Sequence, residues 1–347
     1  MRFIHLVLVF IISLFFVTSV HSQEVVDVYS NLQFCDVTVE GDADGCLLKS
    51  DLRFMNDVIQ TKSLPLDGPG TSIIRWDYFE AEDGPYSVCA TLQKGEDFLS
   101  QRCYSFDYAG RVPLRFEVRD LSVNSEGIDL LILANDPSVV DVYYMLIKGN
   151  RAIYVNSWES YPIMAQPLQV SWDWKQILEN NVEYAGMVKI TEKKTNDTRS
   201  FMKLFIAEDK AEITDTYEDE TGASATVLGR SRVPFEGKVR FILSQNGTHL
   251  ATVEKKTPIL LSGDDETVEI SWNDTLNPGV YQLEIQLIGN DDDLIDLVES
   301  IIEAVIVPKP VAVIEETEES SGVGTAFLII STLTAALILN RRKKFFK

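Results

Sequence analysis

Residues 268–273 read VEISWN, and two earlier stretches follow the same pattern: SIIRWD at 72–77 and LQVSWD at 168–173. In each, a short run rich in apolar residues leads to a tryptophan, and Asp or Asn comes next. A tyrosine follows about ten residues later and opens another such run. The tryptophans are spaced by 96 residues (76 to 172) and by 100 residues (172 to 272). A repeat of that length is a repeat of whole domains rather than of small solenoid units.

The local pattern around the repeats is that of β-strands. Val268, Ile270 and Trp272 alternate with polar residues, and residues 281–287 continue with the same period of two. Turn-forming stretches such as Asn246-Gly247 separate these runs, and long amphipathic helical patterns are missing. Many short strands with frequent turns predict an all-β chain built of β-sandwiches.

Residues 276–283 read LNPGVYQL and resemble the corner between strands E and F of an immunoglobulin-like or fibronectin type III-like domain. The resemblance implies that Tyr281 closes a tyrosine corner, with its hydroxyl bonded to the backbone of the preceding turn. Tyr86 and Tyr184 match by position, although their turns lack the Leu-x-Pro-Gly lead-in. The aligned tryptophans recur at equivalent positions and are therefore expected in the core or at the corner; they are Trp76, Trp172 and Trp272.

The resemblance covers most of residues 23–306 and implies three tandem β-sandwich (immunoglobulin-like) domains. We expect them at 23–110, which holds all four cysteines, at 111–207 and at 208–306. Because many unrelated functions use this sandwich, the fold by itself specifies no activity.

Apolar stretches at both ends predict export and membrane anchoring. Arg2 and the apolar run after it are typical of a secretory signal, which we expect to span residues 1–22; an uncleaved anchor helix is the alternative. Residues 322–339 form a stretch of 18 residues without a charge. A helix of that length spans about 27 Å, close to the hydrocarbon core of a bilayer. The basic residues 341–344, within the tail 340–347, are expected to stay in the cytoplasm, which places the domains outside the cell.

The order of acidic stretch, apolar helix and basic cluster resembles the C-terminal tails of archaeal and bacterial surface proteins. Residues 307–321, with Pro308 and Pro310, are expected to form an extended acidic stalk. The resemblance implies a single-pass protein of the cell membrane. No Leu-Pro-x-Thr-Gly or Pro-Gly-Phe signal precedes Gly322, which favours simple retention over enzymatic processing.

The charge of the chain argues against one class of partner. The net charge is −22, and an acidic surface repels the phosphate backbone of nucleic acids. The apolar fraction of 45% is ordinary for folded protein and too high for a disordered chain. We therefore expect a folded extracellular part that binds no nucleic acid.

Four cysteines in an exported chain favour disulfides over free thiols: Cys35, Cys46, Cys89 and Cys103. Their spacing does not fit a zinc site, which would need a close pair. The sandwich resemblance implies which cysteines pair, because strands F and G are neighbours there. Cys89 and Cys103 lie on these expected strands and should pair, which leaves Cys35 with Cys46.

Other candidate sites give weaker signals. Three Asn-x-Thr sequons, at Asn196, Asn246 and Asn273, are glycosylation candidates. His249, the single histidine after the signal, is expected on the surface, and one histidine supports neither a triad nor a His-based metal centre. The acidic turns 42–45 and 291–293 offer oxygen ligands to calcium but lack EF-hand spacing, so ordinary turns are the preferred interpretation.

Aromatic residues beside the repeated tryptophans suggest an alternative function. Tyr78, Phe79 and Trp174 are not part of the aligned set and are free to stack on a sugar. The preferred hypothesis is a non-enzymatic surface protein that uses its domains for adhesion, envelope assembly or protein contact, without a cofactor. A carbohydrate-binding surface module is the alternative, and an extracellular hydrolase is a third class.

Overall fold

The structure, a computed structural model, describes residues 22–108 and 116–305. All its regular elements are β-strands, so the all-β prediction is confirmed. No helix within the described residues is long and apolar enough to cross a membrane. The predicted span 322–339, the stalk 307–321, the tail 340–347 and nearly all of the signal 1–22 lie outside the described residues.

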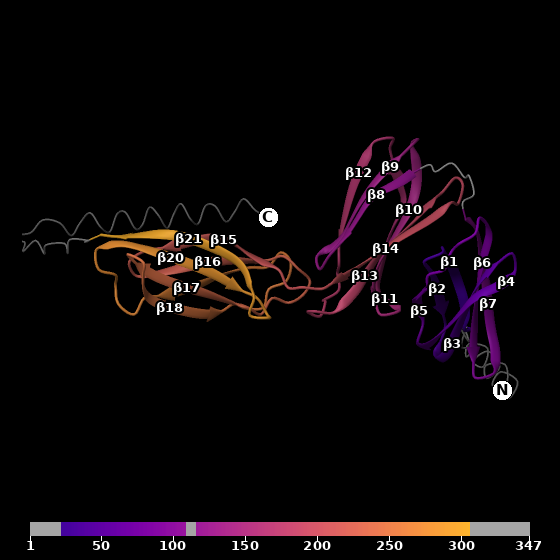
Figure 1. The fold of residues 1–347 in the computed structure, drawn as a ribbon, viewed down its shortest axis with the longest axis horizontal. Coiled ribbons are helices and arrows are strands. Elements are labelled where there is room, and N and C mark those ends of the chain that lie inside the picture. The colour runs from indigo at the N-terminus through magenta and orange to yellow at the C-terminus, as the bar shows by residue number, and fades with distance from the viewer. Residues whose placement is uncertain (1–21, 109–115, 306–347) are drawn as a thin grey trace, which may run out of the picture. The chain divides into compact units, whose positions relative to one another are not determined.

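Figure 1 labels most of the strands. Those of the described residues fall into three groups of seven. The first domain contains β1 (Glu24–Ser30), β2 (Phe34–Glu40), β3 (Asp44–Phe54), β4 (Asp57–Asp67), β5 (Gly70–Arg75), β6 (Gly84–Lys94) and β7 (Asp97–Tyr108). The second contains β8 (Phe116–Val123), β9 (Gly127–Ala134), β10 (Ser138–Lys148), β11 (Arg151–Ile163), β12 (Pro167–Asp173), β13 (Glu183–Glu192) and β14 (Thr198–Ile206). The third contains β15 (Ala211–Glu218), β16 (Gly222–Gly229), β17 (Lys238–Gln245), β18 (Thr248–Lys256), β19 (Asp265–Ser271), β20 (Gly279–Ile288) and β21 (Leu294–Ala304).

The same strand order occurs in every group. The first, second and fifth strands pair in one sheet, and the third, fourth, sixth and seventh pair in the other. The fourth strand therefore joins the sheet that contains strands F and G, whereas antibody constant domains place it with A, B and E. Each domain has its own apolar core of inward-facing residues, as expected for two antiparallel sheets packed face to face.

The register of the structure corrects the alignment of the second repeat. The backbone N–H groups of Trp76, Trp174 and Trp272 each bond to the turn between the first two strands of their domain. The Trp174 indole donates to Asn124 at 2.9 Å, and the Trp272 indole donates to Asp219 at 3.2 Å. Trp174, not Trp172, is therefore the equivalent of Trp272, and the true spacings are 98 residues (76 to 174) and 98 residues (174 to 272).

Both tryptophans of the second repeat lie in the core, which explains the wrong alignment. Trp172 is 5% exposed and Trp174 is fully buried. They are two residues apart, so they point to the same face of the chain, and a slip of two leaves the apolar pattern unchanged. The expectation that Trp174 is free to face a ligand is wrong for the same reason.

The corner tyrosines make the backbone bonds that the resemblance implies. The Tyr281 hydroxyl donates to the Asn277 carbonyl at 2.8 Å, and the Tyr86 hydroxyl donates to the Glu82 carbonyl at 3.0 Å. The Tyr184 hydroxyl instead accepts a bond from the Glu179 N–H at 3.2 Å. All three rings are buried, so each tyrosine serves both the core and the turn of its domain.

Changing Tyr281 to Phe is expected to lower the free energy of unfolding of the third domain by about 0.5–1.5 kcal/mol. The ring stays in the core, and only the bond to Asn277 is lost. Denaturant unfolding of the full chain, followed by hydrogen exchange in β20, measures the effect. Tyr217→Phe is the control, because that side chain is 64% exposed. An unchanged midpoint for Tyr281→Phe would mean that the hydroxyl adds nothing to the stability of the corner.

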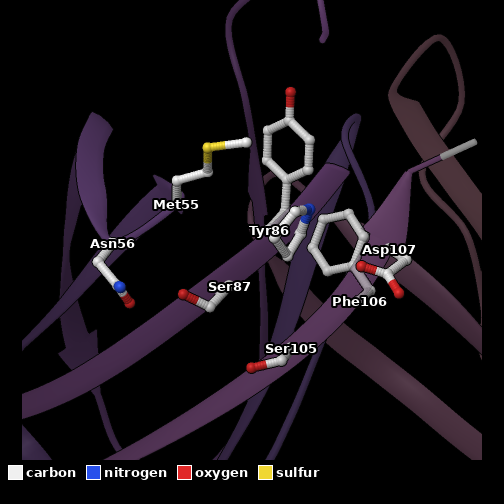
Figure 2. A pocket seen from close by; sticks show the side chains of 8 residues that line it. Met55, Asn56, Tyr86, Ser87, Ser105, Phe106 and Asp107 are labelled. Atoms are coloured by element: carbon white, nitrogen blue, oxygen red, sulfur yellow. The ribbon is translucent and has the colours of Figure 1, made fainter. Parts of the chain in front are cut away.

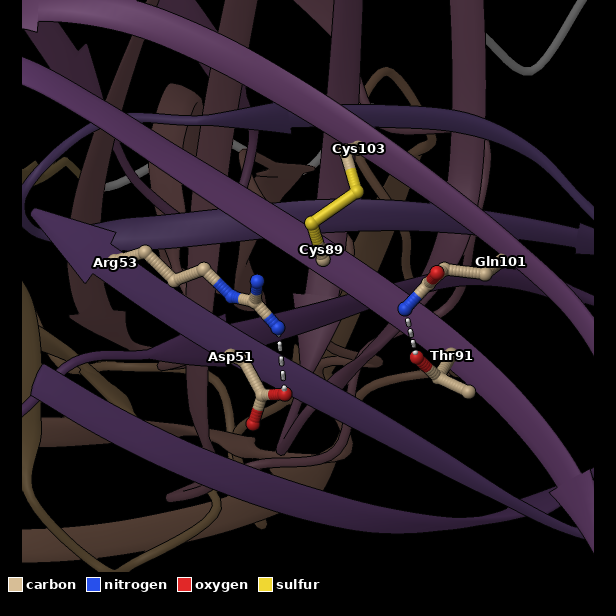
Figure 3. The surroundings of a disulfide bond; sticks show 6 residues. All are labelled: Asp51, Arg53, Cys89, Thr91, Gln101 and Cys103. Carbon is tan, nitrogen blue, oxygen red and sulfur yellow. Dashed lines mark hydrogen bonds and ion pairs between the residues drawn. A yellow bond between two sulfur atoms is a disulfide. The ribbon is translucent and has the colours of Figure 1, made fainter. Parts of the chain in front are cut away.

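One of the two expected disulfides is present. Cys89 on β6 and Cys103 on β7 lie directly opposite each other and are bonded. Figure 3 shows the bond beside the pair Thr91 and Gln101, which are joined by a hydrogen bond of 2.9 Å. The disulfide links the two strands of the last hairpin of the first domain.

The second expected disulfide is absent, and Cys35 and Cys46 are buried free thiols. Cys35 faces Ser50 on β3, four residues from Cys46 along the strand. Four residues of strand cover about 13 Å, whereas a disulfide needs Cα atoms within about 7 Å. Burial raises the pKa of the Cys35 thiol to about 12, which keeps it in the unreactive thiol form.

Candidate functional site: the contact between the first two domains

The strands of all three domains belong to one compact body that ends at Ala304. The first and second domains meet through the outer faces of two sheets. Phe34 on β2 and Ile73 on β5 point away from the core of their own domain but are at most 1% exposed. They pack against residues from β10 and β13: Met145, Ile147, Ala185 and Met187. An outward strand face that is fully buried needs a covering partner, and here the partner is the neighbouring domain.

The sheets of the two domains are also joined at one edge. The Ile73 N–H bonds to the Asn150 carbonyl at 2.8 Å, and Arg151 on β11 lies opposite Ser72 on β5. The Arg151 guanidinium pairs with Asp67 and donates to the Pro69 carbonyl at 3.0 Å. These bonds make one continuous seven-stranded sheet from β1 to β14.

A group of charged side chains lies within this contact. Lys189 on β13 donates to Asp36 on β2 at 3.0 Å and to Asp27 on β1 at 2.8 Å. Its ammonium also lies 5.2 Å from the centre of the Tyr29 ring. The Asp36 side chain is 1% exposed, that of Lys189 is 11% exposed, and that of Asp27 is 54% exposed. Two carboxylates from the first domain therefore hold one lysine of the second, and only one of the two carboxylates reaches water.

Burial sets the ionisation of these groups. It raises the pKa of Asp36 to about 6, although the nearby Lys189 charge acts in the opposite direction. Burial lowers the pKa of Lys189, but Asp36 and Asp27 together outweigh burial, and the net shift is upward. Among the described residues, the second oxygen of Asp36, Oδ2, has no hydrogen-bond partner. An ionised oxygen without a partner is costly in a buried site, which agrees with the raised pKa of Asp36.

The second and third domains also make direct contact. The Leu178 N–H bonds to the Arg232 carbonyl, and the Arg232 N–H bonds to the Ser125 carbonyl, both at 3.0 Å. Val233, from the loop between β16 and β17, is buried in the core of the second domain. Asp291 accepts bonds from two asparagines of the second domain, which gives that acidic turn a structural role.

The sequons and the histidine that the sequence offered as candidates are exposed at the surface. The three sequon asparagines, Asn196, Asn246 and Asn273, are exposed in turns or loops. His249 is exposed and bonds to Thr252 at 2.7 Å. The described residues contain no group of three or more side chains that could hold a metal ion.

Of the three aromatic candidates, Tyr78 is free to face a ligand as predicted, whereas Phe79 and Trp174 are not. Tyr78 is 97% exposed, and Phe79 is partly buried against the core of the first domain. Sequence reasoning missed Trp158 on β11, which is 36% exposed and lies 5.0 Å from the Tyr161 ring. A bulge in β11, with Ser160 at φ 55°, brings Trp158 and Tyr161 to the same side of the strand.

A hollow of about 490 Å³ lies beside the tyrosine corner of the first domain. Figure 2 shows Met55, Tyr86 and Phe106 around it. Met55 and Asn56 form the two-residue tip of the hairpin between β3 and β4, with φ of 47° and 77°. Such a turn favours Asn or Gly, so a methionine is unusual there. Asp107 is the one charged residue among those that line the hollow.

Comparisons with known proteins show no family. No protein-family model matches the chain, and no curated protein matches its sequence. A tetra-tandem repeat from the extending region of a large adhesion protein is similar in structure at 10% identity and a TM-score of 0.25; the match covers 82% of this chain and 74% of that one. Trypsin-activated alpha-2-macroglobulin from Escherichia coli is similar at 11% identity and a TM-score of 0.24, over 82% of this chain and 23% of that one.

Proposed function

We propose that this chain is a non-enzymatic, single-pass surface protein that presents three joined β-sandwich domains for adhesion, envelope assembly or protein contact. The observation that carries the proposal is the bonding between neighbouring domains. The first and second share a buried interface, and the second and third share backbone hydrogen bonds and a core residue. Domains joined in this way keep their exposed surfaces in fixed positions relative to one another. Such an arrangement suits a protein that acts by contact with a partner.

The membrane part of the proposal rests on the sequence. The apolar residues 322–339, followed by basic residues 341–344, would retain the chain with its domains outside the cell. The amino-terminal apolar run would direct export.

Protease added to intact cells is expected to remove the residues before Gly322 and to leave the apolar segment with its basic tail. Quantitative peptide mapping before and after digestion measures which residues are lost. Permeabilised cells, in which the basic tail is also digested, are the control. Protected domains with a digested tail on intact cells would reverse the orientation.

Binding of carbohydrate is the second candidate function, and Trp158 favours it. The exposed indole lies beside Tyr161 and offers an apolar ring face of the kind on which sugar rings stack. Glycan-array binding by the full chain that is lost on Trp158→Ala but kept on Tyr78→Ala would support this function. Binding to envelope proteins that is unaffected by Trp158→Ala would favour the first.

A further inference from the structure

We propose that Lys189 and Asp36 condense to form an amide bond that joins the first domain covalently to the second. The reacting groups are in contact, since the Lys189 Nζ lies 3.0 Å from Asp36 Oδ1. The attacked carbon is bonded to that oxygen, so a small side-chain rotation brings the nitrogen onto it. Intramolecular reactions between well-oriented groups reach effective concentrations of about 10⁵–10⁸ M.

The surroundings favour condensation over a simple ion pair. Asp36 is almost fully buried, and Oδ2 has no hydrogen-bond partner among the described residues. An ordinary buried ion pair is stable only when its remaining polar atoms are also bonded. Both residues lie on strands paired on two sides, β2 between β1 and β5, and β13 between β10 and β14, so the backbone holds them in place.

The second carboxylate has a role in this reaction. Asp27 lies 2.8 Å from the same nitrogen and is half exposed, so it is placed to exchange protons with that nitrogen and with water. Other ionisable groups near the site are Tyr29, Tyr104, Asp197 and Arg199. Of the groups at the site, only Asp36 combines contact with the lysine and full burial.

The reaction balances without any further reagent. The Lys189 ammonium passes one proton to the Asp36 carboxylate, which leaves a neutral amine and a neutral carboxyl group. The amine lone pair attacks Cγ of Asp36, and a C–N bond forms. Asp27 takes a proton from the nitrogen and gives it to the departing hydroxyl, so the C–O bond breaks and one water molecule leaves. No atom is oxidised or reduced, and the buried site disfavours the return of water.

Peptide mapping of the reduced, denatured full chain tests the proposal. We expect a branched tryptic peptide in which the fragment ending at Lys49 is joined to residues 176–193, lighter than the two parts by one water. Trypsin should fail to cleave after Lys189, because an acylated lysine is not a substrate. Lys148 is an internal control, since it pairs with Glu179 at 2.6 Å but at an exposed site, and should be cleaved normally. Two linear peptides with full cleavage after Lys189 would overturn the proposal.

Four variants separate chemistry from folding. Lys189→Arg keeps the positive charge and should give no branched peptide. Asp36→Asn should still give the same branched peptide, because ammonia can leave in place of water. Asp36→Ala should give no branched peptide. Asp27→Asn should slow formation of the amide bond, so that chains sampled soon after synthesis contain less of the branched peptide. A branched peptide in Asp36→Ala would place the bond elsewhere. The mass measurement does not depend on cell-surface location, so its failure leaves the proposed function standing.

Discussion

Replacing Trp174 by Ala is expected to lower the free energy of unfolding of the second domain by about 3–5 kcal/mol. The side chain is fully buried in the core of that domain, and its ring lies 6.5 Å from Tyr144 and 6.4 Å from Tyr154. Alanine would leave a large cavity and would also leave the Asn124 carbonyl without the indole donor. A loss of this size is a large fraction of the stability of a typical domain.

Denaturant unfolding of the full chain, with hydrogen exchange resolved by domain, measures the loss. The matched control is Trp158→Ala, which removes the same side chain from a position that is 36% exposed, and should cost clearly less. Exchange in β20 of the third domain should change little, because that strand belongs to a separate core. Equal effects of the two tryptophans would show that Trp174 does not anchor the core.

The repeat of strand, tryptophan and tyrosine made the β-sandwich predictable from sequence. The period of two around Trp272 and Tyr281 is a property of one strand at a time, and each strand shows it without knowledge of the rest. The exact match between repeats was not predictable in the same way. Trp172 and Trp174 both satisfy the pattern, and only hydrogen bonds to the turn at Asn124 decide between them.

The contact between the first two domains was not predicted, although it left a trace in the sequence. Outward positions on β13 are occupied by Ala185, Met187 and Lys189, which is more apolar than a solvent-facing strand requires. That excess indicates a covered face but does not say what covers it. The partner, β2, lies about 150 residues earlier in the chain, and only the packing of two complete domains brings Asp36 to Lys189.

The failed prediction of a second disulfide has a related cause. Cys35 and Cys46 both face the core of the first domain, as their sequence pattern allows. Their positions along the two facing sheets differ by about four residues, and the sequence carries no measure of that offset. Cys35 was paired with Cys46 because they were the two cysteines left over. Their offset along the strands excludes a disulfide between them.

Replacing Phe34 by Ala is expected to separate the first two domains without unfolding either one. Phe34 is fully buried, yet it contributes to the cluster between the domains rather than to the core of the first. Removing a buried phenylalanine ring costs about 3–5 kcal/mol, and here that cost falls on the contact. Hydrogen exchange should rise at the edge bond between Ile73 and Asn150, while β3 and β6 stay protected.

The measurement is best made in a Lys189→Arg chain, so that no covalent bond between the domains masks their separation. Phe98→Ala is the matched control, because that phenylalanine belongs to the same domain and is 62% exposed. In a chain that retains Lys189, Phe34→Ala should also reduce the branched peptide, since Asp36 and Lys189 meet only when the domains are docked. Loss of protection throughout β3 and β6 would instead mean that Phe34 stabilises the first domain itself. The two domains could then not be separated without unfolding the first one.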